Sequence, residues 1–308
     1  MTVKETIERH ADAIADTDEL DRTDWLDLRR KGLGGSDAAA VLGLNPWQTP
    51  YSVWANKTEQ VEDSKPNMRM RCGQLLEPVV GTLFSEETGI EVDRFPYMLR
   101  SKQWPWMLVN LDFVAESPQA ALEAKTTDAR NAHQWITEEG DAKVPDSYLI
   151  QGQHELAVTG LDRVYFGALI GGNDFRVMEV RRDDYLIENL VEAERKFWEM
   201  VEDATPPAPD GSDVTTRAIK AMYPISTPGV QAELPEEALP ILRALVSTKR
   251  DLKETEEIKN GYENQIKSLL GDAEIGVVNG QVVVSWKSST VKAHWRNESI
   301  RRPLTVKL

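Results

Sequence analysis

Apolar residues in the first two-thirds of the chain follow helix and strand periods in turn. Spacings of three and four residues predict helices over 1–24, 37–44, 47–54, 68–88, 129–139, 147–159 and 183–202. Period-two alternation and short apolar runs predict strands over 90–92, 97–99, 108–116, 121–127, 164–170 and 176–180. Helices and strands that alternate in this way predict a mixed α/β domain that closes near residue 204.

Residues 205–230 are rich in proline, glycine and small polar residues, which predicts a linker or extended arm. Residues 231–308 then form a predicted appendage, with a long amphipathic helix over 239–269 and a β-hairpin that turns at Asn279-Gly280. Its tail mixes basic and aromatic residues, namely Trp286, Lys287, Lys292, His294, Trp295, Arg296, Arg301, Arg302 and Lys307. Such a tail suits nucleic-acid binding or, more simply, charge balance in an acidic protein.

Two of the predicted strands, 108–116 and 121–127, flank the turn-forming residues 117–119 and carry an acid, a second acid and a lysine. Because side chains alternate along a strand, Glu123 and Lys125 share one face and Ala124 points away. Carboxylates of Asp112 and Glu123 on neighbouring strands form a hard-oxygen site suited to Mg²⁺ or Mn²⁺. This unit has the groups needed for metal-assisted phosphodiester hydrolysis, although a hairpin with ordinary surface charges has the same spacing.

Composition limits the class of protein and the cellular location in which this chemistry would occur. The 308 residues carry a formal net charge of −15, which argues against a basic DNA-coating protein but leaves room for an enzyme with a locally basic channel. There is no run of about 18 apolar residues, and the charged N-terminus lacks an apolar signal core. Cys72, the single cysteine, forms no disulfide within the chain. We therefore expect an intracellular protein without a membrane span.

Other polar residues occupy positions that suit a phosphate-binding or metal-binding site. Arg29 and Arg30 precede a glycine-rich loop, after which Ser36 or Asp37 caps a helix, and this arrangement suits either a phosphate pocket or a helix-turn-helix junction with solvated arginines. Glu77 lies among apolar neighbours on a predicted helix, so it either faces inward, where it needs a partner or a metal, or lies on the helix surface.

The helix over 147–159 carries a polar stripe on an otherwise apolar segment. Gln151, His154 and Glu155 lie at i, i+3 and i+4, which places them on one side of the helix.

Four segments in order resemble the YqaJ family of viral recombinases, which includes phage lambda exonuclease and belongs to the PD-(D/E)xK nucleases. They are LRRKGLGGSDAAAVLG, GQLLEPVVGTLF, LDFVAE followed by LEAKTT, and YLIQGQHELAVTG. The resemblance covers about residues 20–204. It implies a restriction-endonuclease-like α/β (α+β) core, with a mixed β-sheet flanked by helices, and a metal-dependent exonuclease that degrades double-stranded DNA ends from 5′ to 3′.

The resemblance also assigns roles to residues. It implies that Asp112, Glu123 and the backbone carbonyl of Ala124 bind Mg²⁺, or Mn²⁺ in its place, and that Lys125 orients the attacking water. Glu77 corresponds to the helix-borne acid that reaches the metal site.

Three further positions match family residues around the substrate. Gln151, in a pattern that Gln153 repeats, borders the active site, and Arg29 and Ser36 hold the 5′-terminal phosphate. Leu111 departs from the family pattern, in which a proline often precedes the first acid. Because the aspartate supplies the ligand, we expect this departure to be tolerated.

The family implies a biological setting as well: a cytoplasmic phage or prophage protein in a bacterial host, 3′ overhangs for phage-type homologous recombination, a single-strand annealing protein as partner, and homo-oligomers such as toroidal trimers. Two other functions share parts of the pattern. A RecB-like repair or defence nuclease has the same acid and lysine core, although one cysteine excludes the members that carry an iron-sulfur cluster. A catalytically idle DNA-binding or assembly module, or a structural α/β protein with coincidental motifs, needs no intact set of Asp112, Glu123 and Lys125.

Overall fold

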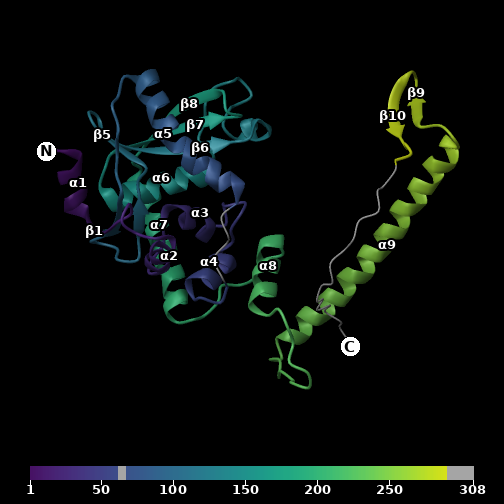
Figure 1. Ribbon diagram of the computed structural model, residues 1–308. Coiled ribbons are helices and arrows are strands. Elements are labelled where there is room, and N and C mark those ends of the chain that lie inside the picture. The colour runs from purple at the N-terminus through teal and green to yellow at the C-terminus, as the bar shows by residue number, and fades with distance from the viewer. Residues whose placement is uncertain (62–66, 290–308) are drawn as a thin grey trace. The chain divides into compact units, whose positions relative to one another are not determined.

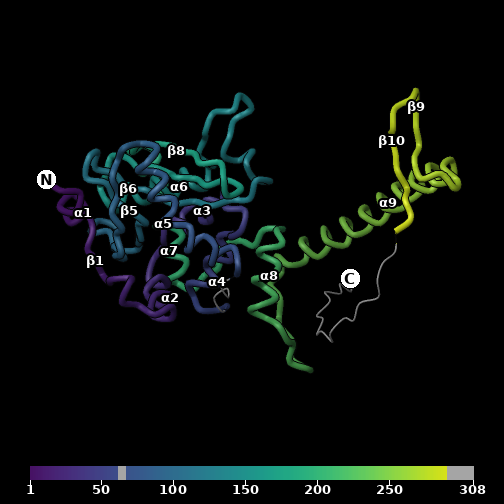
Figure 2. The backbone as a smooth tube through the Cα atoms, turned by 45° about the horizontal axis from the view of Figure 1, so that its top comes forward, coloured from purple at the N-terminus to yellow at the C-terminus, as the bar shows by residue number. Residues whose placement is uncertain are grey.

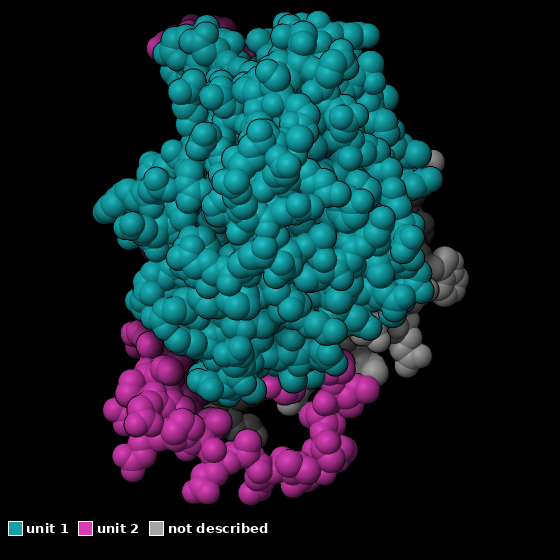
Figure 3. All heavy atoms as spheres, turned by 90° about the vertical axis from the view of Figure 1, so that its left-hand side faces the viewer, with its two compact units in different colours: residues 1–222 teal, residues 223–308 magenta. Residues whose placement is uncertain are grey.

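The computed structural model describes residues 1–61 and 67–289 (Figure 1). The chain divides into two compact units, Met1–Met222 and Tyr223–Leu308, which are coloured separately in Figure 3.

The first unit combines helices with two β-sheets. Its elements up to residue 101 are α1 (Val3–His10), β1 (Ala11–Asp16), α2 (Arg22–Arg30), α3 (Gly35–Val41), α4 (Pro50–Lys57), α5 (Met68–Thr88), β2 (Asp93–Arg94) and β3 (Tyr97–Ser101). It continues with β4 (Leu108–Asn110), β5 (Phe113–Glu116), β6 (Gln119–Thr127), the 3-10 helix η1 (Ala129–Gln134), α6 (Asp146–Thr159), β7 (Arg163–Ile170), β8 (Asp174–Arg181), α7 (Asp184–Glu202) and α8 (Asp213–Met222). The predicted mixed sheet flanked by helices is confirmed.

The larger sheet has the strand order β2-β5-β6-β7-β8, in which β6 and β7 are parallel and the other neighbours antiparallel. Strand alternation gives it two faces, which α5 and α6 cover (Figures 1 and 2). On one face Tyr165 packs its ring 5.3 Å from that of Phe84 in α5. On the other, α6 approaches so closely that a Cβ on Gly152 would lie 2.9 Å from a Val164 methyl group. The core therefore lies on both sides of β6 and β7.

The segment predicted as one strand over 108–116 is two strands. β4 belongs to a small sheet of order β1-β3-β4, whereas β5 belongs to the larger sheet. The chain changes sheet at Leu111 and Asp112, and the buried Leu111 anchors this crossing in the core. Asp112 thus lies at the junction of the two sheets rather than in the middle of a strand.

The single helix predicted over 1–24 is wrong over residues 11–21, which separate α1 from α2. β1 follows α1 directly and pairs antiparallel with β3, from Ala11 opposite Ser101 to Asp16 opposite Tyr97. This pairing with a distant strand outweighs the helix propensity of the alanines in ADAIAD. The prediction over 129–139 is wrong in extent, because only Ala129–Gln134 is helical and it is a 3-10 helix.

Residues 205–230 are not wholly extended. They contain α8, which packs on α4 and buries Thr215 and Ala218. The hydroxyl groups of Thr49 and Thr215 are hydrogen-bonded at 2.9 Å across this buried contact. The first compact unit therefore runs on to Met222, past the boundary expected near residue 204.

The second unit contains α9 (Ala238–Leu270) and a hairpin of β9 (Ile275–Val278) and β10 (Gln281–Ser285). At the hairpin turn Asn279 and Gly280 both have positive φ, 50° and 80°, as expected for this turn sequence. Ion pairs such as Lys259 with Glu263 line the exposed surface of α9. The tail residues Lys292, His294, Trp295, Arg296, Arg301, Arg302 and Lys307 lie outside the described residues. In residues 1–61 and 67–289, no helix has the length and apolar character needed to cross a bilayer.

Candidate active site

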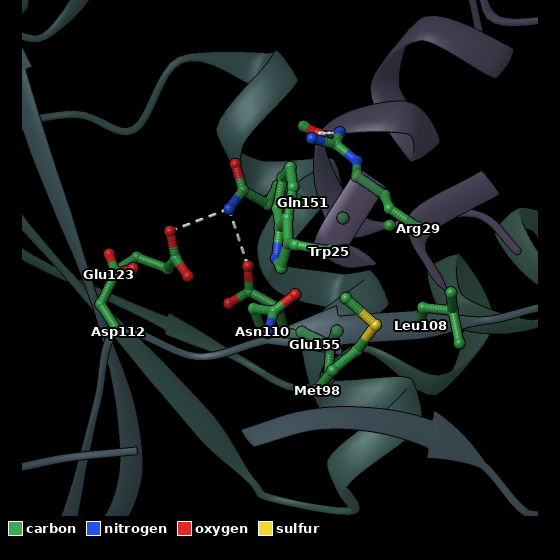
Figure 4. Close-up of a pocket in the computed structure, with 13 residues that line it drawn as sticks. Trp25, Arg29, Met98, Leu108, Asn110, Asp112, Glu123, Gln151 and Glu155 are labelled. Atoms are coloured by element: carbon green, nitrogen blue, oxygen red, sulfur yellow. Dashed lines mark hydrogen bonds between the residues drawn. The ribbon is translucent and has the colours of Figure 1, made fainter. Parts of the chain in front are cut away.

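Residues from six separate segments line one pocket of about 170 Å³ in the first unit (Figure 4). Five of them are candidates from the sequence: Arg29, Ser36, Asp112, Glu123 and Gln151. They come from α2, α3, the β4–β5 junction, β6 and α6, so the fold brings together positions up to 122 residues apart in the chain, from Arg29 to Gln151. The sequence did not single out another lining residue, Asn110 at the end of β4.

β6 orients the central pair as its alternation predicts. Lys125 donates a 2.7 Å hydrogen bond to Glu123 Oε2, and its ammonium lies 5.0 Å from the centre of the Tyr148 ring. Gln151 Nε2 donates to the same Glu123 oxygen at 2.9 Å. Asp112 Oδ2 accepts a 2.8 Å hydrogen bond from the backbone N–H of Ala124, which ties the sheet junction to β6. The two acids and the lysine therefore form one connected group.

The group contains more carboxyl groups than its one lysine can pair with, namely Asp112, Glu123 and Glu155. Burial raises the pKa of Asp112 well above its usual range, and the neighbouring Glu123 charge raises it further. Burial likewise raises the pKa of Glu155 well above its usual range, with Glu123 again adding to the effect. Burial lowers the pKa of Lys125, but the charges of Glu123 and Asp112 outweigh this and raise it above its ordinary value. Lys125 therefore stays protonated beside Asp112 and Glu155, whose ionisation is disfavoured.

The donor set fits a hard divalent cation. Oxygens of Asp112, Glu123 and Glu155 line the same pocket, and extra positive charge there would favour their ionised forms. Within residues 1–61 and 67–289, no three His, Cys, Asp or Glu side chains stand ready-made around a metal position. Ala124, Lys125 and Gln151 donate hydrogen bonds to the carboxylates instead. Metal binding therefore requires rotation of side chains that are already in place.

Arg29 and Ser36 lie at the other end of the pocket. Arg29 Nη2 donates to Ser36 Oγ at 2.5 Å and to Asp37 Oδ1 at 3.2 Å, while its guanidinium lies 5.3 Å from the Trp25 ring centre. Asp37 is buried and also pairs with Lys57 at 2.7 Å. Burial raises the pKa of Asp37, but the charges of Lys57 and Arg29 outweigh it, so the net shift is downward. An aspartate whose pKa is lowered thus holds the arginine at the pocket.

Three predicted site residues are not among the residues that line the pocket: Lys125, Glu77 and Ala124. Lys125 contacts the lining residue Glu123 through its hydrogen bond. Glu77 projects from α5 and is half-buried; burial raises its pKa, Arg94 lowers it and the Glu123 charge raises it again. Glu77 therefore interacts electrostatically with Glu123 without lining the same cavity. Ala124 contributes its N–H to Asp112, and the predicted role of its carbonyl in metal binding stays a prediction.

The polar stripe of α6 divides between two environments. Gln151 and Glu155, four residues apart, face the pocket. His154 is fully buried between Glu194 Oε1 at 2.8 Å and the Leu108 carbonyl at 2.9 Å, so it links α6 to α7 and β4. Gln153 is buried too, and its side chain bonds the backbone of Arg181 and Asp183.

The sequence missed Glu155 and Asp37 as parts of the site. The i, i+4 spacing from Gln151 was the available signal for Glu155. The three partners of Asp37 could not be predicted, because Arg29 lies on α2, Lys57 on α4 and Gly34 in the loop before α3.

Comparison with known proteins identifies relatives of this chain. The model of the YqaJ-like viral recombinase domain matches residues 24–162. Protein YqaJ of Bacillus subtilis (strain 168) is 36% identical over 283 residues, which are 91% of this chain and 87% of that protein. The crystal structure of the alkaline exonuclease LHK-Exo from Laribacter hongkongensis has a TM-score of 0.51 at 18% identity and covers 59% of this chain and 94% of that chain. At this identity, the likeness to LHK-Exo shows a shared fold.

The two comparisons differ in how much of the chain they cover. The Bacillus relative leaves 9% of this chain unmatched, which is less than the share taken by residues 223–308, so at least part of the second unit is shared with it. LHK-Exo matches 59% of this chain. On the family match, and on an identity of 36% across nearly the whole chain, this protein belongs to the YqaJ-like viral recombinase family.

Proposed function

We propose that this protein is a divalent-metal-dependent deoxyribonuclease that degrades the 5′-ended strand of double-stranded DNA. The observation that carries the proposal is the pocket itself. An acidic group suited to a metal and an arginine suited to a phosphate lie in one cavity, although their residues come from separate segments of the chain. The exonuclease fold of the first unit supports the same reaction class.

Asp112 and Glu123, with the Ala124 carbonyl, would hold the cation, and Glu77 would influence it from α5. The cation, Mg²⁺ or Mn²⁺, supplies Lewis-acid stabilisation of the phosphodiester and lowers the pKa of an attacking water. The residues divide the remaining work. Lys125 is held by Glu123 and Tyr148 at the edge of the acidic group, where its fixed positive charge orients the water and offsets charge that develops on the phosphate.

Arg29 and Ser36 set the position of the substrate end. A terminal 5′-phosphate carries more negative charge than an internal phosphodiester, and a guanidinium with a nearby hydroxyl binds it by charge-assisted hydrogen bonds. Anchoring that phosphate at one end of the pocket places the next phosphodiester towards Asp112 and Glu123. The reaction then removes nucleotides from 5′ to 3′ and leaves a 3′ single strand.

This product suits homologous recombination through a single-strand annealing protein. Such a partner, a homo-oligomeric and trimeric assembly, and action on phage DNA in a host cytoplasm stay predictions.

The test is digestion of a linear, 5′-phosphorylated duplex labelled on each strand in turn, with Mg²⁺, comparing wild type with Lys125→Ala. We expect wild type to release label from the 5′ end, and the variant to be slower by at least about a hundredfold, as when one transition-state donor is lost. Lys196→Ala is the matched control, because Lys196 is an exposed lysine on α7 outside the pocket.

Two other outcomes of this digestion would favour a different function. Release of label from 3′ ends, or cleavage within the strand, would replace the proposed polarity by that of a RecB-like repair or defence nuclease. If wild type digests nothing with Mg²⁺ or Mn²⁺ but binds duplex DNA, the protein is a binding or assembly module and the proposal fails.

A further inference from the structure

Glu155 reaches the pocket from α6, and the proposed function assigns it no role. Its exposure is 1%, yet it lines the same cavity as Asp112 and Glu123. A carboxylate buried this deeply normally requires a paired charge or a metal.

The Gln151 amide links Glu155 to the acidic group. Its Nε2 donates to Glu155 Oε1 at 2.8 Å and to Glu123 Oε2 at 2.9 Å, as Figure 4 shows. Two oxygens that accept from one NH₂ group lie within about 5 Å of each other. The carboxylates of α6 and β6 are therefore close enough to share a cation after small side-chain rotations.

The second oxygen of Glu155 has no hydrogen-bond partner among the described residues, although it is buried. An unsatisfied buried polar atom is costly, and a glutamate with only a packing role would not need to leave one. Glu194 has a similar unpartnered oxygen, but it pairs with His154 and lies outside the pocket. Glu155 therefore differs in having its unused oxygen next to the acidic pocket.

α3 leaves room over this carboxylate because residue 35 is a glycine. A Cβ there would lie 3.0 Å from Gln151 Cγ and 3.3 Å from Glu155 Oε1. A side chain at position 35 would crowd both residues, whereas glycine keeps them accessible from the pocket.

We propose that Glu155 is a further ligand of the divalent cation in this pocket, which binds between the Glu155 and Glu123 carboxylates. The ion is a hard, oxygen-seeking cation of the Mg²⁺ and Mn²⁺ class. Lys125 and Gln151 both donate to Oε2 of Glu123, so Oε1 of Glu123 and Oε2 of Glu155 are the oxygens used. The proposed ligands thus come from α6 (Glu155) as well as from β6 (Glu123) and the β4–β5 junction (Asp112). This inference deepens the proposed function and rests on it.

The test measures Mn²⁺ binding to the full chain without DNA, by titration calorimetry, and the rise in melting temperature that Mn²⁺ causes. Glu155→Gln keeps the size of the side chain and the hydrogen bond of its first oxygen but cannot serve as an anionic ligand. We expect its Mn²⁺ dissociation constant to rise at least about tenfold and the melting-temperature rise to shrink accordingly. Asp146→Asn, which removes an exposed acid from the first turn of the same helix, is the control and should bind like wild type.

A Glu155→Gln variant that binds Mn²⁺ within twofold of wild type would overturn the inference and leave the proposed nuclease intact. If wild type itself neither binds Mn²⁺ nor digests DNA, both the proposed function and the role of Glu155 as a ligand are refuted. Should Glu155→Gln not fold, Glu155→Asp replaces it, because a shorter acid withdraws the ligand while keeping its charge. An unchanged Mn²⁺ affinity in that variant would equally refute the role of Glu155.

Discussion

Replacing Asp37 by asparagine should destabilise the first unit strongly, because this side chain neutralises a buried lysine. Asp37 and Lys57 pair at 2.7 Å with 3% and 2% of their side chains exposed. Asparagine keeps the shape and an acceptor for the Gly34 N–H, which donates to Asp37 at 3.0 Å. The substitution therefore removes the charge while changing little else.

The magnitude follows from the burial of the pair. Removing one member of a buried ion pair costs about 3–5 kcal/mol, and retention of the Gly34 hydrogen bond favours the lower end, about 3 kcal/mol. The bond from Arg29 adds little, since 30% of the Arg29 side chain is exposed and its charge is screened. For a unit of this size, each kcal/mol moves the melting temperature by about 2–4 °C, so the expected drop is about 6–12 °C.

The effect should depend on pH with a definite sign. Because the folded-state pKa of Asp37 is lowered, its contribution is present above the unfolded-state pKa, about 3.9, and is lost as pH falls through the folded-state pKa. The charged groups that act on it are Arg29 and Lys57, with His154 also coupled to its charge. The difference between wild type and Asp37→Asn should therefore be present at about pH 5 and shrink below about pH 4.

The assay is thermal unfolding followed by circular dichroism at several pH values. Asp27→Asn is the control, because Asp27 pairs with Arg30 at 2.7 Å on the surface with 57% of its side chain exposed, and such pairs contribute less than about 1 kcal/mol. A drop in melting temperature for Asp37→Asn no larger than that for Asp27→Asn would refute the reasoning, as would a difference that grows towards acid pH.

Two further predictions concern substrate selection and the domain boundary. Arg29→Ala should reduce the preference for 5′-phosphorylated over unphosphorylated ends by at least about tenfold, the size of one charge-assisted hydrogen bond, in a competition digest with exposed Arg195→Ala as control. An unchanged ratio would contradict the phosphate role. A chain ending at Met222 should keep the melting temperature of the first unit, whereas one ending at Ala204 should be less stable by about 1–3 kcal/mol, because Thr49 loses its buried partner Thr215. Equal melting temperatures would contradict the packing of α8 on α4.

Local sequence determined the elements whose geometry depends on nearby residues. Strand alternation alone placed Glu123 and Lys125 on one face, and their 2.7 Å hydrogen bond agrees. The Asn279-Gly280 turn and the long helix before it were likewise predictable, since turn chemistry and helical periodicity act over a few residues. The resemblance of four ordered motifs then identified the family before any coordinates were needed.

Tertiary structure decided what depends on partners distant in the chain. β1 is a strand because β3 pairs with it, and α8 is ordered against α4 within a segment whose composition predicts a linker. The burial of Asp37 and Glu155 follows from neighbours on other elements, as does the change of sheet at Asp112. Local propensity cannot determine such features, because the energy of a strand pair or a buried charge is set by contacts that exist only after the chain has folded.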